Sequence, residues 1–227
     1  MKALSAASTA ASRALRRLVP ALAFVLALAG TATAEVRILA FGDSLTAGSD
    51  LPPHEGFAPQ LEAWLHAHGA ADATVINAGV PGETSAGGLA RIGSVLGPEV
   101  DAVIVELGAN DLLRGLDVGA MRRNLDGILT EVGQHGLPVL LAGLPAPPNY
   151  PAAYRREFKA AFRDVAREHG AIYVSSFFGG MAEGRSMRQV MALFQSDGLH
   201  PNAEGVAAIV EGMGPPVLKL VKRARAR

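Results

Sequence analysis

The sequence predicts an α/β fold in which helices cover both faces of a parallel sheet. From residue 36 onwards, apolar runs of strand length alternate with longer amphipathic segments, as expected for repeated strand–helix–strand units. The short runs are almost continuously apolar, which is typical of strands that are buried on both faces. In such sheets ligands bind at the carboxyl ends of the strands. We therefore expect the functional residues directly after the strands.

Five segments are predicted as strands and five as helices. The predicted strands are residues 36–41, 74–78, 102–107, 138–142 and 171–174. The predicted helices are residues 57–68, 88–96, 121–135, 152–169 and 202–221, the last of them interrupted at Gly214-Pro215-Pro216. Each strand ends at glycine or serine, and several helices end at glycine, a common C-terminal cap. No repeat or linker divides the chain, so we expect residues 35–227 to form one domain.

The composition excludes several classes of site. The chain has 227 residues, 49% of them hydrophobic, no cysteine and a formal net charge of zero. This length supports one domain with a sizeable core, and the lack of cysteine excludes disulfides, thiolate metal sites and a cysteine nucleophile. Residues 1–34 hold four basic residues and no acid, which leaves 17 of the 21 Lys and Arg residues against 21 acidic ones. Nothing in this balance indicates a nucleic-acid partner.

The N-terminus has the pattern of a secretory signal peptide over residues 1–34. Its basic part ends at Arg16-Arg17, an apolar stretch covers residues 18–29, and Ala32-Thr33-Ala34 is a small-x-small cleavage pattern. About a dozen apolar residues are too few to cross a bilayer of roughly 30 Å as a helix. We expect cleavage after Ala34 and a periplasmic or secreted mature chain. The alternative is an uncleaved membrane anchor.

The first chemically distinctive block is Gly42-Asp43-Ser44-Leu45, directly after the first predicted strand. A serine in a turn between strand and helix presents its hydroxyl at the edge of the sheet, near helix N–H groups that favour negative charge. Ser44 is therefore a candidate nucleophile. In the alternative interpretation, Ser44 or Asp43 only caps the helix, because the block is not the G-x-S-x-G turn of α/β-hydrolases.

A second block places Asp197 and His200 three residues apart near the C-terminus. A carboxylate at this spacing can fix the imidazole tautomer and stabilise the imidazolium, as the acid of a Ser-His-Asp arrangement does. The alternative is a turn whose Asp197 caps the next helix. The other five histidines lie in a proline-rich loop or near helix ends. Without cysteine or clustered acids, we expect no metal site.

Acyl transfer also needs hydrogen-bond donors directed at a developing oxyanion. Gly79 ends the second predicted strand, and Asn110 follows the third. The N–H groups of Ser44 and Gly79, together with the Asn110 amide, would then form the oxyanion hole. Singly, Gly79 could be a strand-ending turn and Asn110 a helix cap. The occurrence of all four blocks after predicted strands favours one site.

Together these blocks resemble the SGNH, or GDSL, hydrolase family. The matching residues are Gly42-Asp43-Ser44-Leu45, Gly79, Gly108-Ala109-Asn110-Asp111 and Asp197-Gly198-Leu199-His200-Pro201. The resemblance runs from about residue 36 to 221 and is strongest to small bacterial arylesterases and multifunctional acyl-CoA thioesterase/lysophospholipases. It implies a three-layer α/β/α sandwich with a flavodoxin-like, doubly wound sheet of about five parallel strands.

The resemblance also implies an activity. Ser44 would attack a carboxylic ester with His200 as base and Asp197 orienting it, and no cofactor or metal would be needed. The expected partner is a small-molecule ester or thioester, namely aryl or short-to-medium acyl esters, thioesters or lysophospholipids, and the expected state is a monomer. This chain departs from the family at Ser49-Asp50, where an aromatic residue and glycine are usual, and at Ala109, often glycine. Neither change touches a reacting group, and the first would alter the rim of the acyl or alcohol pocket.

Substrate preference is expected to depend on loops. Residues 79–88 and 144–151 are the predicted pocket walls. An acyl groove could be lined by apolar residues before the histidine block, which could instead be ordinary core: Phe177, Phe178, Met181, Met187, Met191 and Phe194.

Three other interpretations remain. The chain could be a carbohydrate or peptidoglycan O-acetylesterase, or a catalytically silent binding module; a nucleotide binder is disfavoured because no phosphate-binding loop is present. The basic C-terminal residues Lys222, Arg223, Arg225 and Arg227 could make at most peripheral contact with an anionic membrane.

Overall fold

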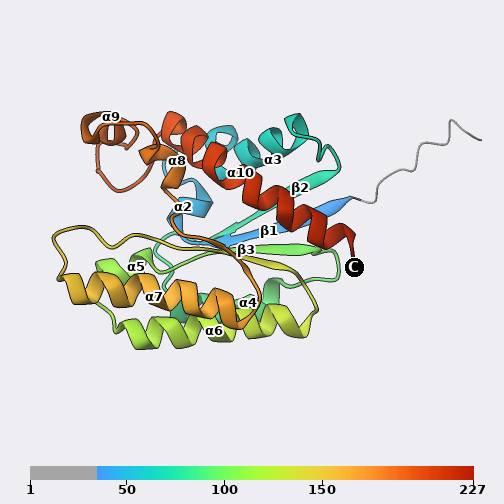
Figure 1. Ribbon diagram of the computed structural model, residues 1–227. Helices are drawn as coiled ribbons and strands as arrows, with labels where there is room; N and C mark the ends of the chain where they lie inside the picture. Colours follow the sequence, from blue (N-terminus) through green and yellow to red (C-terminus); the bar gives the residue numbers. More distant parts are fainter. Residues whose placement is uncertain (1–34) are drawn as a thin grey trace, which may run out of the picture. The chain divides into compact units, whose positions relative to one another are not determined.

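Five parallel strands form the sheet, in the order β2-β1-β3-β4-β5 (Figure 1). They are β1 (Val36–Gly42), β2 (Ala73–Gly79), β3 (Ala102–Glu106), β4 (Val139–Ala142) and β5 (Ile172–Val174). The computed structural model describes residues 35–227, and the predicted signal peptide, residues 1–34, lies outside them. The parallel doubly wound sheet and all five strands confirm the sequence prediction. Since the strand order reverses at β1, the carboxyl ends of β1 and its neighbours are where such sheets bind ligands.

Helices cover both faces of the sheet, which gives three layers (Figure 1). One face carries α3 (Phe57–Ala67), α8 (Gly179–Ala182) and α10 (Ala203–Arg225), with α10 packed against both of the others. The other face carries α4 (Ser85–Val95), α6 (Val118–Gln134) and α7 (Ala152–Glu168). Short elements occupy the connections: α2 (Ser44–Ala47), η1 (Pro53–Glu55), α5 (Ala109–Leu113) and α9 (Met187–Met191).

The predicted interruption of the last helix is wrong, because α10 continues through Pro215 and Pro216. Proline removes a backbone donor and crowds the preceding turn. Here the helix is continuous through that region, where it packs closely against α3 and α8. A Cβ added to Gly214 would lie 2.5 Å from the ring of Trp64 on α3, and one added to Gly212 would lie 2.8 Å from the backbone of Gly180. Tertiary packing thus overrides the local signal.

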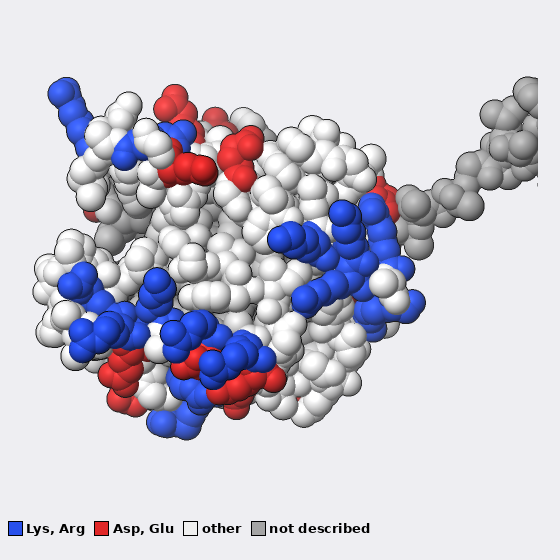
Figure 2. Space-filling view, viewed as in Figure 1, with Lys and Arg blue, Asp and Glu red and all other residues white. Residues whose placement is uncertain are grey.

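The C-terminal basic residues tie α10 to the amino ends of the strands. Arg223 donates to the carbonyl of Gly170 before β5 at 2.9 Å, and Arg225 pairs with Asp72 before β2. Lys and Arg side chains gather around this end of the molecule (Figure 2). The last turn of α10 is therefore anchored at the end of the sheet opposite to α2 and α5.

The core is apolar, with a polar group at one edge. Residues Glu35–Arg227 form one compact unit, and every residue of β3 and β4 is buried. Within it, the buried polar or charged residues are Asp43, Thr46, Ser85, Glu106 and Asp111. All lie at or just after the carboxyl ends of β1, β2 and β3. None of the helices in residues 35–227 has the length and apolarity needed to cross a membrane.

Candidate active site

Ser44, His200 and Asp197 form a hydrogen-bonded series at the carboxyl edge of the sheet. The distance from His200 Nε2 to Ser44 Oγ is 2.9 Å, and that from His200 Nδ1 to Asp197 Oδ2 is 2.6 Å. Ser44 is the first residue of α2, whereas His200 and Asp197 lie in the turn before α10. The fold therefore brings together two blocks that are 156 residues apart. A hydroxyl bonded to an imidazole that is itself held by a carboxylate is the arrangement of an activated nucleophile.

Asp197 is held by its own turn. Its Oδ1 accepts the backbone N–H groups of Leu199 at 2.9 Å and His200 at 3.1 Å, which leaves Oδ2 for the imidazole. The hydrogen bond from Leu199, followed by those from the His200 side chain and backbone, lowers the pKa of Asp197 to about 2. The carboxylate is therefore ionised at neutral pH. The alternative of a helix cap does not apply, because Asn202 caps α10 by accepting the Gly205 N–H at 2.9 Å.

Gln195 connects the turn that contains Asp197 and His200 to the loop that follows Ser44 and α2. Its side-chain amide donates to the carbonyl of Ser49 at 3.1 Å and to that of Pro201 at 3.0 Å. Its backbone N–H donates to the carbonyl of His200 at 2.8 Å. Nothing in the local sequence distinguishes this glutamine, because its role depends on a contact 146 residues away.

Asp43, and not Ser44, is the cap of α2. Its Oδ1 accepts the Leu45 N–H at 3.0 Å, so the Ser44 hydroxyl is left to face His200. Gly42 lies under this turn, where an added Cβ would be 2.1 Å from Thr46 Oγ1 and 2.6 Å from the carbonyl oxygen of Glu106. A side chain at residue 42 would therefore displace α2 and the nucleophile with it.

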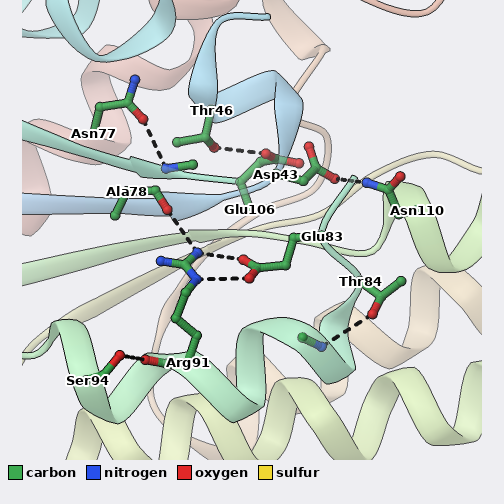
Figure 3. Close-up of polar contacts among 12 residues, drawn as sticks. Asp43, Thr46, Asn77, Ala78, Glu83, Thr84, Arg91, Ser94, Glu106 and Asn110 are labelled. Carbon is green, nitrogen blue, oxygen red and sulfur yellow. Dashed lines mark hydrogen bonds and ion pairs between the residues drawn. The ribbon is translucent and has the colours of Figure 1, made fainter. Parts of the chain in front are cut away.

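Asn110 is held at the same pocket by Asp43. Its Nδ2 donates to Asp43 Oδ2 at 3.0 Å (Figure 3). Since an amide nitrogen carries two hydrogens, the second N–H remains available to the pocket, which Asn110 lines together with Ser44 and His200. The structure thus brings Asn110 to the place predicted for it.

Gly79 lies elsewhere, which corrects its assignment as an oxyanion donor. Its N–H donates to Asn77 Oδ1 at 3.0 Å (Figure 3), and it is not among the residues that line the pocket. Glycine is required there because β2 passes close to α2: an added Cβ would be 2.3 Å from the Ala47 nitrogen and 2.8 Å from the Asp43 carbonyl oxygen. Its place after a strand therefore reflects packing.

Gly82 lines the pocket instead, beside Ser44, Asn110 and His200. It follows Pro81 in a turn closed by a 3.1 Å hydrogen bond from the Glu83 N–H to the Val80 carbonyl, with Gly82 at φ 78°. Proline followed by a glycine of positive φ is the signature of a type II turn. The Pro81-Gly82 pair thus marks the turn in the sequence, although it does not show which glycine N–H faces the pocket.

Two polar contacts fix this turn from either side. Glu83 pairs with Arg91 of α4, whose Nε lies 2.9 Å from Glu83 Oε1 (Figure 3). Asp111, buried beside Asn110, accepts the Ser85 N–H at 2.8 Å and the Ser85 hydroxyl at 2.6 Å. The loop before α4 and the start of α5 are therefore positioned together.

The pocket at these residues has a volume of about 830 Å³. Both predicted walls contribute, since Pro81 and Gly82 come from one loop and the other supplies Leu144, Pro145 and Pro147. The departures from the family pattern, Ser49, Asp50 and Ala109, also lie in its lining. Further apolar lining residues are Leu45, Leu112, Leu113 and Leu199.

Only part of the predicted acyl groove lines this pocket. Phe178 and Phe194 do. Phe177 and Met181 are buried in the core, where the Phe177 ring packs 5.1 Å from that of Phe57. Met187 and Met191 lie on α9 with 74% and 51% of their surface exposed. Within residues 35–227 no three His, Asp or Glu side chains are grouped as a metal ion would require.

The match to a known family decides the identity. Residues 40–208 match the GDSL-like lipase/acylhydrolase family. The chain belongs to this family. The chain is thus an enzyme of the carboxylic ester hydrolase class, as its sequence predicted.

Known relatives align with this chain over most of their lengths. Esterase TesA of Pseudomonas aeruginosa is 34% identical to this chain over 185 residues, which is 81% of this chain and 89% of TesA. The thioesterase 1/protease 1/lysophospholipase L1 of Escherichia coli is 32% identical over 200 residues, 87% of this chain and 91% of the relative. The structure of AlinE4, an SGNH-hydrolase family esterase, matches with 43% identity and a TM-score of 0.66, over 82% of this chain and 96% of AlinE4.

Proposed function

We propose that this chain is an exported serine esterase that hydrolyses aryl and short-to-medium acyl esters through an acyl-enzyme on Ser44. The observation that carries the proposal is the 2.9 Å contact between Ser44 Oγ and His200 Nε2, in an imidazole whose other nitrogen is bonded to Asp197. Export rests on the signal-peptide pattern of residues 1–34.

The proposed reaction has two steps. His200 removes the Ser44 proton as Oγ attacks the ester carbonyl, and Asp197 stabilises the imidazolium. The tetrahedral oxyanion is bound by the N–H groups of Ser44 and Gly82 and by the Asn110 amide. His200 then donates its proton to the departing alcohol. In the second step His200 activates water, which releases the carboxylic acid and restores the Ser44 hydroxyl.

The lining of the pocket supports an apolar acyl or aryl group. Its side chains are mostly aliphatic, proline and aromatic, with Phe178 and Phe194 near the histidine turn. A cavity of about 830 Å³ is larger than an acetyl group alone would need. Thioesters and lysophospholipids are included in the proposed range because the Escherichia coli relative is named for both activities.

A substrate panel tests the proposal. Nitrophenyl esters of increasing chain length are compared with an acyl-CoA, a lysophospholipid and acetylated xylan, and a fluorophosphonate probe is mapped by peptide mass. We expect turnover of esters longer than acetyl and label on Ser44. Activity that peaks at acetyl and extends to xylan would identify a carbohydrate O-acetylesterase instead. No turnover and no label would identify a binding module.

Replacing Asn110 by alanine is expected to lower kcat by roughly 10²–10³-fold, because the loss of one oxyanion donor typically costs about 2.7–4 kcal/mol in the transition state. KM should change little, since the donor acts mainly on charge that develops during the reaction. Steady-state kinetics on a nitrophenyl ester measure both constants.

Asn77→Ala is the matched control. In the wild type the Asn77 amide donates to the Ala47 carbonyl at 3.2 Å, and Asn77 does not line the pocket. It should retain nearly full kcat. Wild-type kcat in the Asn110→Ala enzyme would show that Asn110 is not part of the oxyanion hole.

A further inference from the structure

Glu106 is a buried acid that the proposed reaction does not use. It is the last residue of β3, its register partner in β1 is Gly42, and its exposed fraction is 0%. The preceding strand residues are all apolar and buried. A carboxyl group in such a place needs a chemical explanation, because burial without full hydrogen bonding is costly.

The contacts of Glu106 favour its neutral form. Oε2 accepts the Thr46 hydroxyl at 2.9 Å (Figure 3). Oε1 is buried and has no donor among residues 35–227. An ionised carboxylate would leave that oxygen unsatisfied, whereas a proton on Oε1 would make it a donor.

The acceptor for such a proton is Asp43. The carboxyl groups of Asp43 and Glu106 are neighbours, close enough for the charge of Asp43 to act on Glu106 (Figure 3), and Asp43 is also fully buried. Its oxygens already accept the Leu45 N–H and the Asn110 amide, both at 3.0 Å. Two adjacent buried carboxyl groups do not ionise together, because like charges in a dry site repel.

The environment assigns the proton to Glu106. Burial, followed by the charge of Asp43, raises the pKa of Glu106 well above its usual range. Burial raises the pKa of Asp43 to about 6, while the Leu45 and Asn110 hydrogen bonds and the charge of His200 act against that rise and Asp111 adds to it. Each Asp43 oxygen already accepts a donor, whereas Glu106 Oε1 has none, so the proton is placed on Glu106 and the charge on Asp43.

We propose that Glu106 is a positioning residue for the oxyanion hole, which it serves as a protonated donor to the Asp43 carboxylate. An ionised Asp43 can only accept, so the Asn110 amide must turn its nitrogen toward it. The second N–H of Asn110 is then directed to the pocket. If Asp43 were protonated, its hydroxyl could bond the Asn110 oxygen, and the amide could rotate away from its working orientation. This role rests on the proposed function of Ser44 and Asn110.

Two substitutions separate this role from simple packing. Glu106→Gln keeps a neutral side chain that can accept from Thr46 and donate to Asp43, so we expect kcat and its pH profile to stay close to wild type. Glu106→Leu removes the donor. We expect kcat to fall by about ten- to a hundredfold with KM nearly unchanged, and the acidic limb of kcat to move to higher pH, because Asp43 then takes up its proton closer to neutrality.

A double-mutant cycle gives a readout that a packing role would not change. In the Asn110→Ala background, Glu106→Leu should cause little further loss of kcat, because both changes act on the same donor. Glu62→Gln is the matched control: Glu62 accepts the Val75 N–H at 2.8 Å, away from the pocket, and its loss should leave the pH profile unchanged. Fully additive losses in the cycle, or a Gln variant as impaired as the Leu variant, would overturn the proposal.

Infrared spectroscopy tests whether Glu106 is protonated, without any measurement of activity. The Ser44→Ala protein at neutral pH should show the carbonyl band of a protonated carboxyl group, and Glu106→Gln should remove it. This measurement also decides the question if Glu106→Leu does not fold. Absence of the band would overturn the role of Glu106 whatever the enzyme hydrolyses. A band in a chain without esterase activity would instead contradict only the proposed function.

Discussion

Replacing Ser44 by alanine is expected to lower kcat on a nitrophenyl ester by about 10⁶-fold, because removal of the nucleophile from a Ser-His-Asp arrangement has an effect of that size. The acyl-enzyme can no longer form, and labelling by a fluorophosphonate should be lost. Substrate binding should persist, since the apolar lining of the pocket is unchanged. Burst-phase kinetics and intact-mass measurement of the labelled protein report the two losses separately.

Ser49→Ala is the matched control for Ser44→Ala. Ser49 lines the same pocket, but its buried hydroxyl has no hydrogen-bond partner among the described residues. Its removal should leave labelling intact and should not lower the stability of the protein, because no bond is broken. A Ser44→Ala protein that still forms a covalent adduct would place the nucleophile elsewhere.

The periodicity of the chain was sufficient to predict its layers. Buried parallel strands and amphipathic helices leave distinct patterns, and all five strands lie where those patterns placed them. The error at Pro215 and Pro216 has a different origin, because a local rule cannot include the packing of Gly214 on Trp64. Contacts between distant segments decide whether a helix continues past such a signal.

The site was predictable where the chemistry depends on residue type and less so where it depends on backbone direction. Ser44, Asn110, Asp197 and His200 reach one pocket because the carboxyl ends of parallel strands share one edge. An N–H donor has no side chain to mark it, and the choice between the glycines at 79 and 82 required the direction of the turn after β2.

Glu106 shows a second limit of the sequence. A charged residue at the end of an apolar strand was visible, but its contact with Thr46 and Asp43 appears only when β1 and β3 lie side by side. Register thus determines which buried acids meet, and with that the protonation of the group behind the oxyanion hole.

Replacing Asp197 by asparagine is expected to lower kcat by about 10⁴-fold with the geometry of the turn preserved. The asparagine oxygen can still accept the N–H groups of Leu199 and His200, but its amide would face His200 Nδ1. The imidazole would then carry its proton on Nε2, so that nitrogen could no longer accept the Ser44 proton. Because the pKa of Asp197 is about 2, the carboxylate is ionised at neutral pH, where the two proteins are to be compared.

Asp126→Asn is the matched control for Asp197→Asn. Asp126 accepts a 2.7 Å contact from His169 Nε2 between α6 and α7, so the same change is made in an aspartate–histidine pair outside the pocket. Its kcat should equal that of the wild type.

The free energy of unfolding adds a second readout for Asp197. The lowered pKa of Asp197 contributes stability above the ordinary value of 3.8, and this contribution is lost as the pH falls toward about 2. The stability difference between wild type and Asp197→Asn should therefore shrink over that interval. In the kinetic comparison, an equal loss of kcat in Asp126→Asn and Asp197→Asn would contradict the role of Asp197.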